Sequence, residues 1–499
     1  MGGLLILRLT VEFMELVPER DFDVLVVGGG PAGSVLTTRL AHLGYRVCLL
    51  DRKVEISIGE TLSPSVRMLF SHAGVEVDWC SPMAIPTGGN LVCWGNPEIE
   101  HIPFSPDGRV HGYQVDRSAF DAALRQKASF AGAVVFSSAD LLDFCKLPGD
   151  AWQCTFSALA DRPRTIRARW IADATGRRHR LGGKLTTYRT YTPHLFGIIG
   201  YWTSPGTSDH QDLLVEALEE GWLSFAPLPT GQANIALMTG LEVVRSRATQ
   251  SLREFYLQNI SSSRYTWNKV SSFKPPQRVR IFDATPRIAD ASIGPGWILV
   301  GDASSELDPL CGQGVQKAVS SALTASLVIH TILARPSHAE VAIQFYEGRE
   351  RSVFAEHLRG LYHHYARETR WSDRAFWKAR MVPSEWPFKD ELLPYRSGSV
   401  HLQPHDRIRL GRGTCIVKRP VLEGEFIEIK EVVTSPGNER GVRYYGTICV
   451  PDLLALLEDS PRAVDVVQRY LAKTARSMTP QYLFEALCRL LSSGIIEKL

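Results

Sequence analysis

The sequence predicts an α/β protein: a Rossmann-like nucleotide-binding domain that carries an inserted mixed β-sheet, followed by a small α+β domain. Three patterns predict this architecture. A glycine-rich turn follows a buried strand near residue 28, alternating strand patterns run from about 88 to 245, and a proline-containing segment precedes residues 413–499. With 44% hydrophobic and 22% charged residues in a chain of 499, a large buried core is available.

The first predicted unit is a strand, turn, helix and strand between about 21 and 50. Residues 24–27 form an uninterrupted apolar run, which is typical of a parallel strand covered on both faces. Apolar residues recur at helical spacing over 35–43, and Gly44 is placed to end the helix. A second buried run over 47–50 completes a βαβ unit.

The turn of this unit has the spacing of a dinucleotide-binding loop. Gly28 permits the tight turn, Gly30 lets backbone N–H groups approach a pyrophosphate, and Gly33 lets the helix pack on the strand. Asp51 ends the second strand, where a carboxylate accepts hydrogen bonds from ribose hydroxyls. The predicted nucleotide-contacting residues of this unit are Gly28, Gly30, Pro31, Ala32, Gly33, Asp51 and Arg52.

A second glycine-containing turn follows another predicted buried strand, over residues 296–302. Asp302 is placed to accept a hydrogen bond from a sugar-alcohol hydroxyl. The segment 308–314 then leads into a long apolar helix that reaches about Ala334. The turn at 312–314 directs free N–H groups and the positive end of the helix dipole at the space before the helix N-terminus. Such an arrangement stabilises negative charge on a reduced flavin ring.

The remaining segments predict how the chain divides. Strand patterns at 91–94, 195–202 and 233–238 predict a second sheet between pieces of the nucleotide domain, and helical patterns within 313–380 follow. We predict an N-terminal extension, a nucleotide-binding domain with an interleaved substrate domain, a linker and a C-terminal domain, with boundaries at 1–20, 21–395, 396–412 and 413–499. Residues 1–13 precede Met14 and are interpreted as a functionless extension.

Four segments resemble the FAD-dependent aromatic monooxygenases of the p-hydroxybenzoate hydroxylase type and the related flavin-dependent halogenases. They are Gly28–Gly33, Gly59–Leu62, Val115–Asp121 and Gly301–Gly314. The resemblance covers most of residues 21–380 and implies FAD, with Asp302 near the ribityl chain and Arg117 near the phosphates; the alternative for Arg117 is a surface arginine at a helix start. The further cofactor residues it implies are Arg117, Asp302, Pro309, Gly312, Gln313 and Gly314.

The resemblance leaves the electron donor open. Ala172–Arg177 is similar to the family's strand end near the nucleotide, but it lacks the Asp-Gly motif of hydroxylases that use NAD(P)H. Direct reduction by NAD(P)H and reduction by a separate flavin reductase are therefore both open.

The same resemblance separates two reactions. The family's halogenases need a lysine that follows the Gly-Glu-Thr-like motif, and no lysine lies between Lys53 and Lys127. The Trp-x-Trp-x-Ile-Pro signature is also absent, and Trp222–Pro229 stands where a related segment is expected. Oxygen transfer from a flavin hydroperoxide needs no such lysine, but it does need a pocket that excludes water.

Candidate acid–base residues come from two loops that the family places near the flavin ring. Glu60 and Asp308 are the candidates, because a base there can remove a proton from the substrate as oxygen is transferred. In the alternative, Glu60 caps a turn and Asp308 fixes the loop at Pro309. Cys311 is interpreted as a small buried thiol rather than a catalytic one.

Composition narrows the class of protein. The formal charge of +3 predicts no nucleic-acid footprint, and nine cysteines without a Cys-x-x-Cys spacing indicate reduced thiols in the cytoplasm. The adjacent His363 and His364 diverge on a helix, so no metal site is predicted. No apolar run approaches the roughly 18 residues of a membrane span, so no membrane partner is expected.

The C-terminal region predicts three strands followed by three helices. The strands are expected near 415–421, 426–433 and 442–450, and the last helix is capped by Thr479 and ended by Gly494. This order resembles winged-helix-like modules with which peptide-modifying enzymes bind a substrate peptide. The resemblance implies that a peptide adds a strand at the edge of 442–450. A dimerisation or packing domain and a DNA-binding winged helix are the alternatives.

Together, the two resemblances imply an FAD-dependent monooxygenase that hydroxylates a tryptophan side chain in a peptide or small protein, with molecular oxygen as co-substrate. The chain resembles the flavoproteins that do this during biogenesis of tryptophylquinone cofactors, as in the maturation of quinohemoprotein amine dehydrogenase. A small-molecule aromatic hydroxylase, a halogenase, an isoprenoid reductase and a non-catalytic flavin-binding scaffold are the alternatives.

Overall fold

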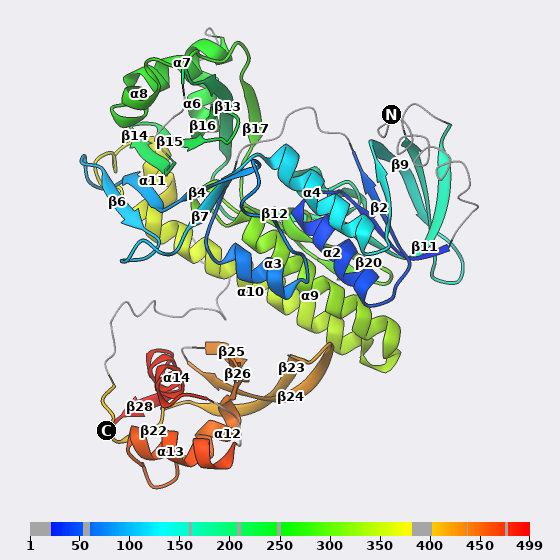
Figure 1. Ribbon diagram of the computed structural model, residues 1–499, viewed down its shortest axis with the longest axis vertical. Coiled ribbons are helices and arrows are strands. Elements are labelled where there is room, and N and C mark those ends of the chain that lie inside the picture. Colours follow the sequence, from blue (N-terminus) through cyan, green and yellow to red (C-terminus); the bar gives the residue numbers. More distant parts are fainter. Residues whose placement is uncertain are drawn as a thin grey trace. The chain divides into compact units, whose positions relative to one another are not determined.

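Figure 1 shows the computed structural model, which describes residues 21–52, 60–158, 162–206, 211–246, 251–381, 402–436, 438–474 and 478–499. The chain forms two compact units. The first contains residues 1–330 and 346–385, and the second contains 331–345 and 386–499. The predicted boundaries at 395 and 413 stay predictions. The predicted extension at 1–20 and the first part of the predicted linker lie outside the described residues.

An eight-stranded sheet forms the centre of the first unit and confirms the predicted βαβ unit (Figure 1). Its path is β19–β20–β11–β1–β2–β8, in which β1 pairs in parallel with both β2 and β11. The apolar run at 24–27 is buried, as expected for a parallel strand in the interior of a sheet. The bounds are β1 Asp21–Val27, α2 Pro31–His42, β2 Val47–Asp51, α4 Arg117–Phe130, β8 Val134–Ser137, β11 Arg164–Asp173, β19 Ile293–Gly294 and β20 Trp297–Leu299.

Two strand assignments differ from the sequence prediction. Residues 134–173 belong to this first sheet and not to the inserted one, because β9 (Ala139–Lys146) and β10 (Trp152–Ala158) continue it from β11 as antiparallel strands. Antiparallel strands with one exposed face alternate in polarity, which made them similar in sequence to the inserted sheet. The strand predicted at 296–302 ends at Leu299, and residues 301–303 form the 3₁₀ turn η2 instead.

The inserted sheet has seven strands in the order β17–β13–β16–β15–β14–β5–β6 and is mixed, because β14 and β5 pair in parallel. Helices α6–α8 accompany it, and its core contains Trp202, Phe225 and Tyr256. The bounds are β5 Gly89–Cys93, β6 Glu100–Pro103, β13 Leu195–Thr203, β14 Leu213–Leu218, β15 Gly221–Pro227, β16 Gln232–Gly240, α6 Leu241–Ser246, α7 Leu252–Ser262, α8 Tyr265–Val270 and β17 Arg280–Asp283.

Two three-stranded sheets and several short helices complete the strand-bearing part of this unit. The sheets have the orders β3–β7–β4 and β12–β18–β21. The bounds are β3 Glu60–Leu62, α3 Val66–His72, β4 Ala84–Thr87, β7 Gly112–Val115, η1 Gly176–Arg178, α5 Gly182–Leu185, β12 Tyr188–Thr190, β18 Arg287–Ala289, η2 Gly301–Ala303, β21 Ser305–Glu306 and η3 Pro309–Cys311.

Two long and two short helical elements follow, where the sequence predicts helices. They are α9 Gly314–Ala334, η4 Pro336–His338, α10 Ala339–Ala366 and α11 Ala375–Met381. Among the described residues, α9 is one helix that is long and apolar enough to cross a membrane, by length and composition alone. Half of its most apolar window is buried inside the protein, which also fits the core helix of a folded domain.

In the second unit, the three-stranded sheet β23–β24–β25 packs with three helices around a core that contains Val433, Leu453 and Leu487. The last helix is capped by Thr479 as predicted. The bounds are β22 Ile408–Leu410, β23 Cys415–Glu423, β24 Phe426–Ser435, β25 Asn438–Val442, β26 Tyr444–Tyr445, β27 Ile448–Cys449, α12 Val450–Leu454, α13 Ala463–Lys473, α14 Pro480–Ser492 and β28 Ile496–Lys498.

The third strand predicted in this unit is wrong in position. The strand that pairs with β24 is β25, which ends where the predicted strand at 442–450 was to begin. Residues 444–449 form the short β26–β27 hairpin, with Gly446 at φ +55°, and Val450 already begins α12. Pro451 in the first turn explains this helix start, because proline fits that position without losing a hydrogen bond. The predicted peptide-binding edge at 442–450 is therefore not a continuous strand.

Candidate functional site

In the glycine turn after β1, a side chain at Gly28 or Gly33 would clash with neighbouring atoms, whereas Gly30 faces open space. Gly28 has φ +108°, and a Cβ there would lie 2.3 Å from the Ala174 carbonyl oxygen. A Cβ on Gly33 would lie 1.8 Å from the Gly28 oxygen. At Gly30 the nearest atom to such a Cβ is Nη2 of Arg117, 4.0 Å away. The backbone of Gly30 is therefore the approachable part of the turn.

The first turn of α2 offers backbone donors at this position. Gly30 is its N-cap and supplies no side-chain hydrogen bond, so no side chain caps the first N–H groups. Residues 31–33 follow at once, and the next N–H, of Ser34, donates to the Gly30 oxygen. Uncapped N–H groups at the positive end of a helix dipole fit a phosphate group.

Asp51 lies beside this turn at the end of β2. Its Oδ1 accepts from the Gly29 N–H at 2.9 Å, and its Oδ2 lies 3.2 Å from Nε of Arg125. Burial raises the pKa of the Asp51 carboxyl, while Arg125 and the Gly29 N–H act in the opposite direction. Arg52 follows and is exposed, and it lies close enough to Arg178 to contribute, after burial, to a lowered pKa of that guanidinium.

Arg117 faces the glycine turn rather than bulk solvent, because its side chain is only 22% exposed. It begins α4, which Asp116 caps, and its Nε and Nη2 donate to Asp121 at 2.9 and 3.0 Å. Its Nη1 donates to Oε2 of Glu60 at 2.5 Å. Burial lowers the pKa of Arg117, but the two carboxylates outweigh burial and raise it, so this side chain stays positively charged.

Glu60 connects the first glycine turn to the second. Its Oε2 binds Arg117, while its Oε1 lies 3.4 Å from the position that a Cβ on Gly314 would take. Burial raises the pKa of the Glu60 carboxyl, and Arg117 opposes that rise. The residue before it, Gly59, lies outside the described residues. Glu60 thus lies between a cation and the N-terminus of α9, two groups that favour a negative charge.

The second glycine turn packs directly against the first. Gly301 has φ +64°, and a Cβ there would lie 2.9 Å from the Cβ of Ala32. The buried Lys317 on α9 holds this turn, because its Nζ donates to the carbonyl oxygens of Gly301, at 2.9 Å, and Ser305. The same Nζ lies 3.9 Å from Oδ1 of Asp302. All four family-like segments therefore meet in one place.

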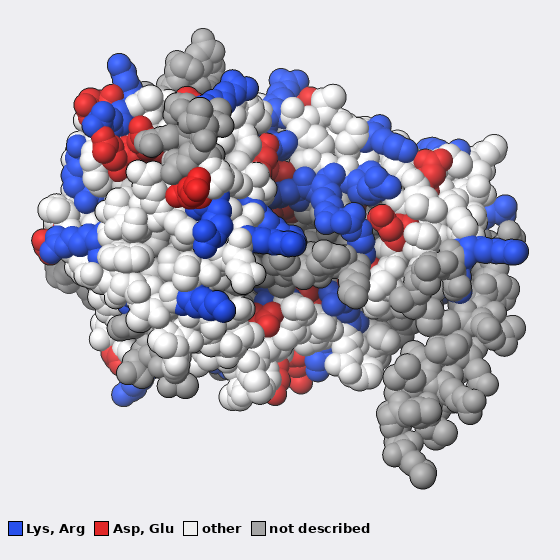
Figure 2. Space-filling view, turned by 90° about the horizontal axis from the view of Figure 1, so that it is seen from above, with Lys and Arg blue, Asp and Glu red and all other residues white. Residues whose placement is uncertain are grey.

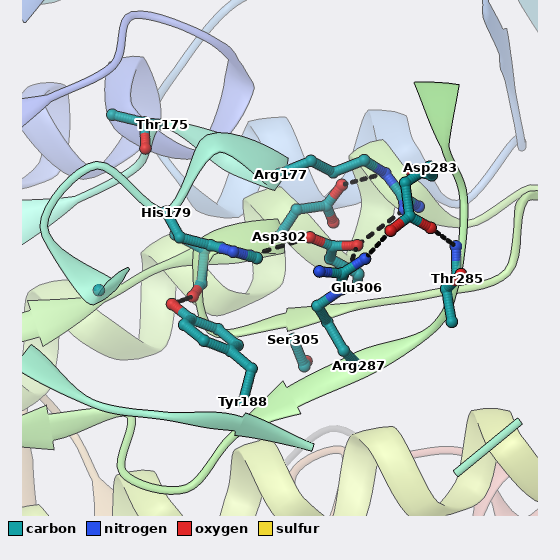
Figure 3. A network of polar contacts seen from close by, with 12 residues as sticks. Thr175, Arg177, His179, Tyr188, Asp283, Thr285, Arg287, Asp302, Ser305 and Glu306 are labelled. Atoms are coloured by element: carbon teal, nitrogen blue, oxygen red, sulfur yellow. Dashed lines mark hydrogen bonds and ion pairs between the residues drawn. The ribbon is translucent and has the colours of Figure 1, made fainter. Parts of the chain in front are cut away.

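A buried carboxylate, Glu306, gathers three basic side chains behind Asp302 (Figure 3). Its oxygens lie 2.8 Å from Arg177 Nη1, 2.9 Å from His179 Nε2 and 3.3 Å from Arg287 Nε. Arg177 also donates to the Leu307 oxygen at 2.8 Å. Because Arg177 contacts several points of this segment, it fixes the chain between the two predicted site residues Asp302 and Asp308.

Asp308 lies at the far end of that segment and is 4% exposed. Its Oδ1 accepts from the Leu310 N–H at 2.9 Å, and its Oδ2 accepts from the Tyr365 hydroxyl at 3.1 Å. Burial raises the pKa of Asp308 to about 6, against the opposing effects of the Leu310 N–H, Arg380, Tyr365 and Arg177. A carboxyl with this pKa can exchange a proton near neutral pH.

The residues after Asp308 present the start of α9 to accessible space. Gly312 has φ +59°, and Gly312 and Gln313 are exposed, whereas Pro309 and Gly314 are half-buried. Burial and Asp308 raise the pKa of Cys311 to about 12, so it is a thiol at neutral pH. The site therefore has uncapped backbone N–H donors after Gly30, a carboxylate at Asp302 and a helix N-terminus at Gly314.

Sequence reasoning missed several residues that hold this site. Lys317, Arg177, Glu306 and Tyr365 were not named as site residues, although Lys317 is a single charge inside an otherwise apolar helix and could have drawn attention. The pairing of Arg177 with Glu306 has no local signal, because 129 residues separate them. Within the described ranges, no group of three or more His, Cys, Asp or Glu side chains could hold a metal ion.

Charged side chains of both signs lie on the face of the molecule shown in Figure 2. On the face shown in Figure 2, Lys and Arg side chains gather toward the middle of the view, with Asp and Glu side chains among them and uncharged residues around them. This distribution matches a sequence with 56 basic and 53 acidic residues.

Comparisons with known proteins identify the family of this chain. The family described as FAD binding domain matches residues 21–352. LodB of Marinomonas mediterranea, a protein assigned as an FAD-dependent oxidoreductase, is 26% identical to this chain. The match covers 72% of this chain and 97% of LodB. The tryptophan 2-halogenase of Chondromyces crocatus is 28% identical over 65% of this chain and 64% of its own.

Two solved structures share the fold along nearly the whole chain. The flavin-dependent halogenase CmlS superposes with a TM-score of 0.78 at 20% identity and covers 96% of both chains. QhpG, a peptidyl tryptophan dihydroxylase essential for tryptophylquinone cofactor biogenesis, superposes with a TM-score of 0.70 at 22% identity, over 95% of this chain and all of its own. At these identities the two likenesses show the fold, and the predicted α/β class is confirmed.

Proposed function

Since the chain belongs to the FAD binding domain family and is a flavin-dependent enzyme that uses FAD, we propose that it is a monooxygenase that hydroxylates a tryptophan side chain in a peptide or small protein. The observation that carries the proposal is the absence of lysine between Lys53 and Lys127, where the resemblance places the essential lysine of halogenases. Without that lysine, oxygen transfer is the flavin chemistry for which the chain retains its residues.

The proposed FAD site uses the groups that meet at the two glycine turns. The uncapped start of α2 and the guanidinium of Arg117 hold the phosphates, and Asp51 accepts from the ribose. Asp302 accepts from the ribityl chain, and the N-terminus at Gly314 stabilises negative charge on the ring. When bound, FAD supplies the activation of molecular oxygen, a chemistry that protein side chains lack.

Asp308 is the proposed acid–base residue. It is buried, holds its carboxylate between the Leu310 N–H and the Tyr365 hydroxyl, and has a pKa of about 6. At neutral pH it is mostly ionised, so it can take a proton from the substrate's indole ring as oxygen is added. Glu60 is proposed as a positioning residue, because its carboxylate is already engaged by Arg117.

A peptide substrate is favoured by the structural likeness to the peptidyl tryptophan dihydroxylase, which extends over 95% of this chain. The second unit, with its own core and capped last helix, is the proposed peptide-binding part. Because the continuous strand predicted at 442–450 is absent, strand addition there is not part of this proposal. Reduced nicotinamide nucleotide, directly or through a separate flavin reductase, is the proposed source of electrons.

Halogenation of an aromatic ring is the second candidate. The relative from Chondromyces crocatus is a tryptophan 2-halogenase, and the halogenase CmlS has the same fold over 96% of both chains. This candidate needs another residue to do the work of the lysine that is absent from residues 54–126.

The test of the proposed function separates both candidates in one reaction. FAD-loaded protein is chemically reduced and exposed to ¹⁸O₂ with tryptophan-containing peptides, free tryptophan, and chloride and bromide. We expect ¹⁸O in the tryptophan of a peptide, detected by mass spectrometry. A chlorinated or brominated ring would replace the proposal with halogenation, and labelled free tryptophan without labelled peptide would replace the peptide substrate with a small molecule.

A further inference from the structure

A chain of two hydrogen bonds joins the inserted sheet to the loop before η3. The indole Nε1 of Trp222, on β15, lies 3.1 Å from the hydroxyl oxygen of Tyr365, on α10. That hydroxyl lies 3.1 Å from Oδ2 of Asp308. All three side chains are buried, with exposures of 2%, 1% and 4%. Three segments that are distant in the sequence therefore meet at the Tyr365 hydroxyl.

The chemistry of the three groups fixes the direction of this chain. An indole N–H can donate but cannot accept, so the oxygen of Tyr365 accepts from Trp222. The Tyr365 proton is then free to point along the second bond, and an ionised carboxylate can only accept it. Donation runs from Trp222 through Tyr365 to Asp308, and hydrogen bonds in such a chain polarise one another.

We propose that Tyr365 and Trp222 are positioning residues of the reaction, which hold Oδ2 of Asp308 in place as a proton acceptor. The inference rests on the proposed function and adds two residues to its machinery. It also assigns a role to Trp222, the first residue of the segment Trp222–Pro229.

Packing of aromatic rings keeps the Tyr365 hydroxyl in place. Its ring lies 5.9 Å from that of Trp94, 6.1 Å from that of Phe376 and 6.0 Å from that of Trp377, in edge or tilted contacts. Such contacts leave the ring little freedom to rotate away from Asp308. The donor is therefore fixed before substrate arrives, as an acid–base site requires.

The groups around Asp308 come from several elements and act in opposite directions. Burial raises its pKa to about 6, and four groups lower it: the Leu310 N–H in its own turn, Arg380 on α11, Tyr365 on α10 and Arg177 after β11. Cys311, in the same turn, is a neutral thiol near neutral pH. Removing the Tyr365 hydroxyl removes a donor that stabilises the carboxylate, so the pKa of Asp308 should rise.

The matched variants are Tyr365→Phe, Trp222→Phe and Tyr362→Phe. The last is the control, because Tyr362 lies on the same helix and loses a buried hydroxyl that donates to the Tyr191 oxygen at 2.8 Å instead. Phenylalanine keeps the ring, so Tyr365→Phe preserves the aromatic packing. FAD content of each holoenzyme reports whether the site is intact.

The direct measurement is the infrared carbonyl band of protonated Asp308, identified by its loss in Asp308→Asn and followed against pH in FAD-loaded protein. We expect a midpoint near 6 in the unmodified protein. In Tyr365→Phe the midpoint should rise by about one pH unit, the effect of one hydrogen bond to a charged group. Trp222→Phe should raise it less, and Tyr362→Phe should not change it.

The second measurement is the pH dependence of ¹⁸O transfer, whose acid limb should move by the same amount in Tyr365→Phe. An unchanged infrared midpoint in Tyr365→Phe would overturn the inference, and so would a shifted midpoint with an unshifted rate profile. A shifted midpoint in a protein whose unmodified form transfers no oxygen would sustain the hydrogen-bond chain and overturn the proposed function instead.

Discussion

Two carboxylates at opposite ends of the flavin site, Glu60 and Asp308, were equal candidates in the sequence, but their surroundings differ. The Glu60 side chain is 28% exposed, and its carboxylate forms an ion pair with Arg117. Asp308 is 4% exposed and accepts hydrogen bonds from two neutral groups, the Leu310 N–H and the Tyr365 hydroxyl. A full positive charge lies against the first carboxylate, and none lies within ion-pair distance of the second among the described residues.

This difference teaches how one fold assigns two roles to the same type of side chain. Burial raises the pKa of both carboxyls, but the Glu60 carboxylate is paired with Arg117, which opposes the rise and is oriented by that pair, whereas the pKa of Asp308, with neutral hydrogen-bond donors, reaches about 6. The charged pair thus lies beside the glycine turn at Gly30, and the titratable group lies within the 301–314 segment.

The largest expected effect comes from removing the titratable group. Asp308→Asn should lower the rate of oxygen transfer at pH 7 by about 10³-fold, within the range for loss of an acid–base residue. FAD content should not change, because the contacts of Asp308 are with Tyr365 and its own turn. Single-turnover formation of ¹⁸O-labelled peptide, after reduction of the bound flavin, measures this. A fall of less than tenfold would contradict the role.

The next effect concerns stability. The pKa of Asp308 is raised from 3.8 to about 6 in the folded protein, so the folded state binds its proton more tightly. The stability that this proton contributes is present below pH 3.8 and is lost as pH rises to about 6. Relative to Asp308→Asn, the unmodified protein should lose up to about 3 kcal/mol across that window.

Urea unfolding of both proteins at several pH values between 4 and 7 measures this difference. Cys311→Ser at the neighbouring position is the control, since it leaves the Asp308 carboxyl in place. A difference between the two proteins that does not vary with pH would mean that Asp308 titrates alike in the folded and unfolded states.

A smaller effect is expected at the charged end of the site. Arg117→Ala removes the guanidinium nearest to Gly30 and leaves Glu60 and Asp121 without their cation. FAD affinity should fall by about thirty-fold, or about 2 kcal/mol, the effect of removing one partner of a partly buried charge pair. Titration of the apoprotein with FAD measures it. Arg109→Ala, a residue with an 86% exposed side chain, is the control and should bind FAD as before.

The smallest effect is expected at Cys311. Its thiol has a pKa of about 12, so Cys311→Ser changes no charge near neutral pH. Rate and FAD affinity should stay within about twofold of the unmodified protein, as for most substitutions that remove no charge or cap. Inactivation by this substitution, or rapid alkylation of Cys311 at pH 7, would instead indicate a reactive thiolate.

The parts of the site that follow from local rules were predictable. Gly28, Gly30 and Gly33 have fixed spacings between a strand and a helix, and the structure places them in such a turn. The packing of Gly301 on Ala32 and the pairing of Arg117 with Glu60 join segments far apart in the chain. Their meeting was expected only from the family resemblance and not from any local pattern.

The parts that were missed depend on tertiary contacts alone. Trp222 and Tyr365 are 143 residues apart, and nothing in either segment announces their hydrogen bond. In the second unit, a strand was predicted near 442–450, but Gly446 lies in a hairpin there and Pro451 lies in the first turn of the helix that begins at Val450. The turn preference of glycine and the helix-start preference of proline outweigh the strand propensity of the neighbouring residues there.

The division of roles between the two carboxylates is tested most directly by one pair of pH–rate profiles. Glu60→Gln and Asp308→Asn are neutral isosteres, and ¹⁸O transfer is measured for both from pH 5 to 8 with saturating FAD. The account predicts that Glu60→Gln keeps the inflection near pH 6 and that Asp308→Asn loses it. A profile that is flat in Glu60→Gln and still inflected in Asp308→Asn would contradict it.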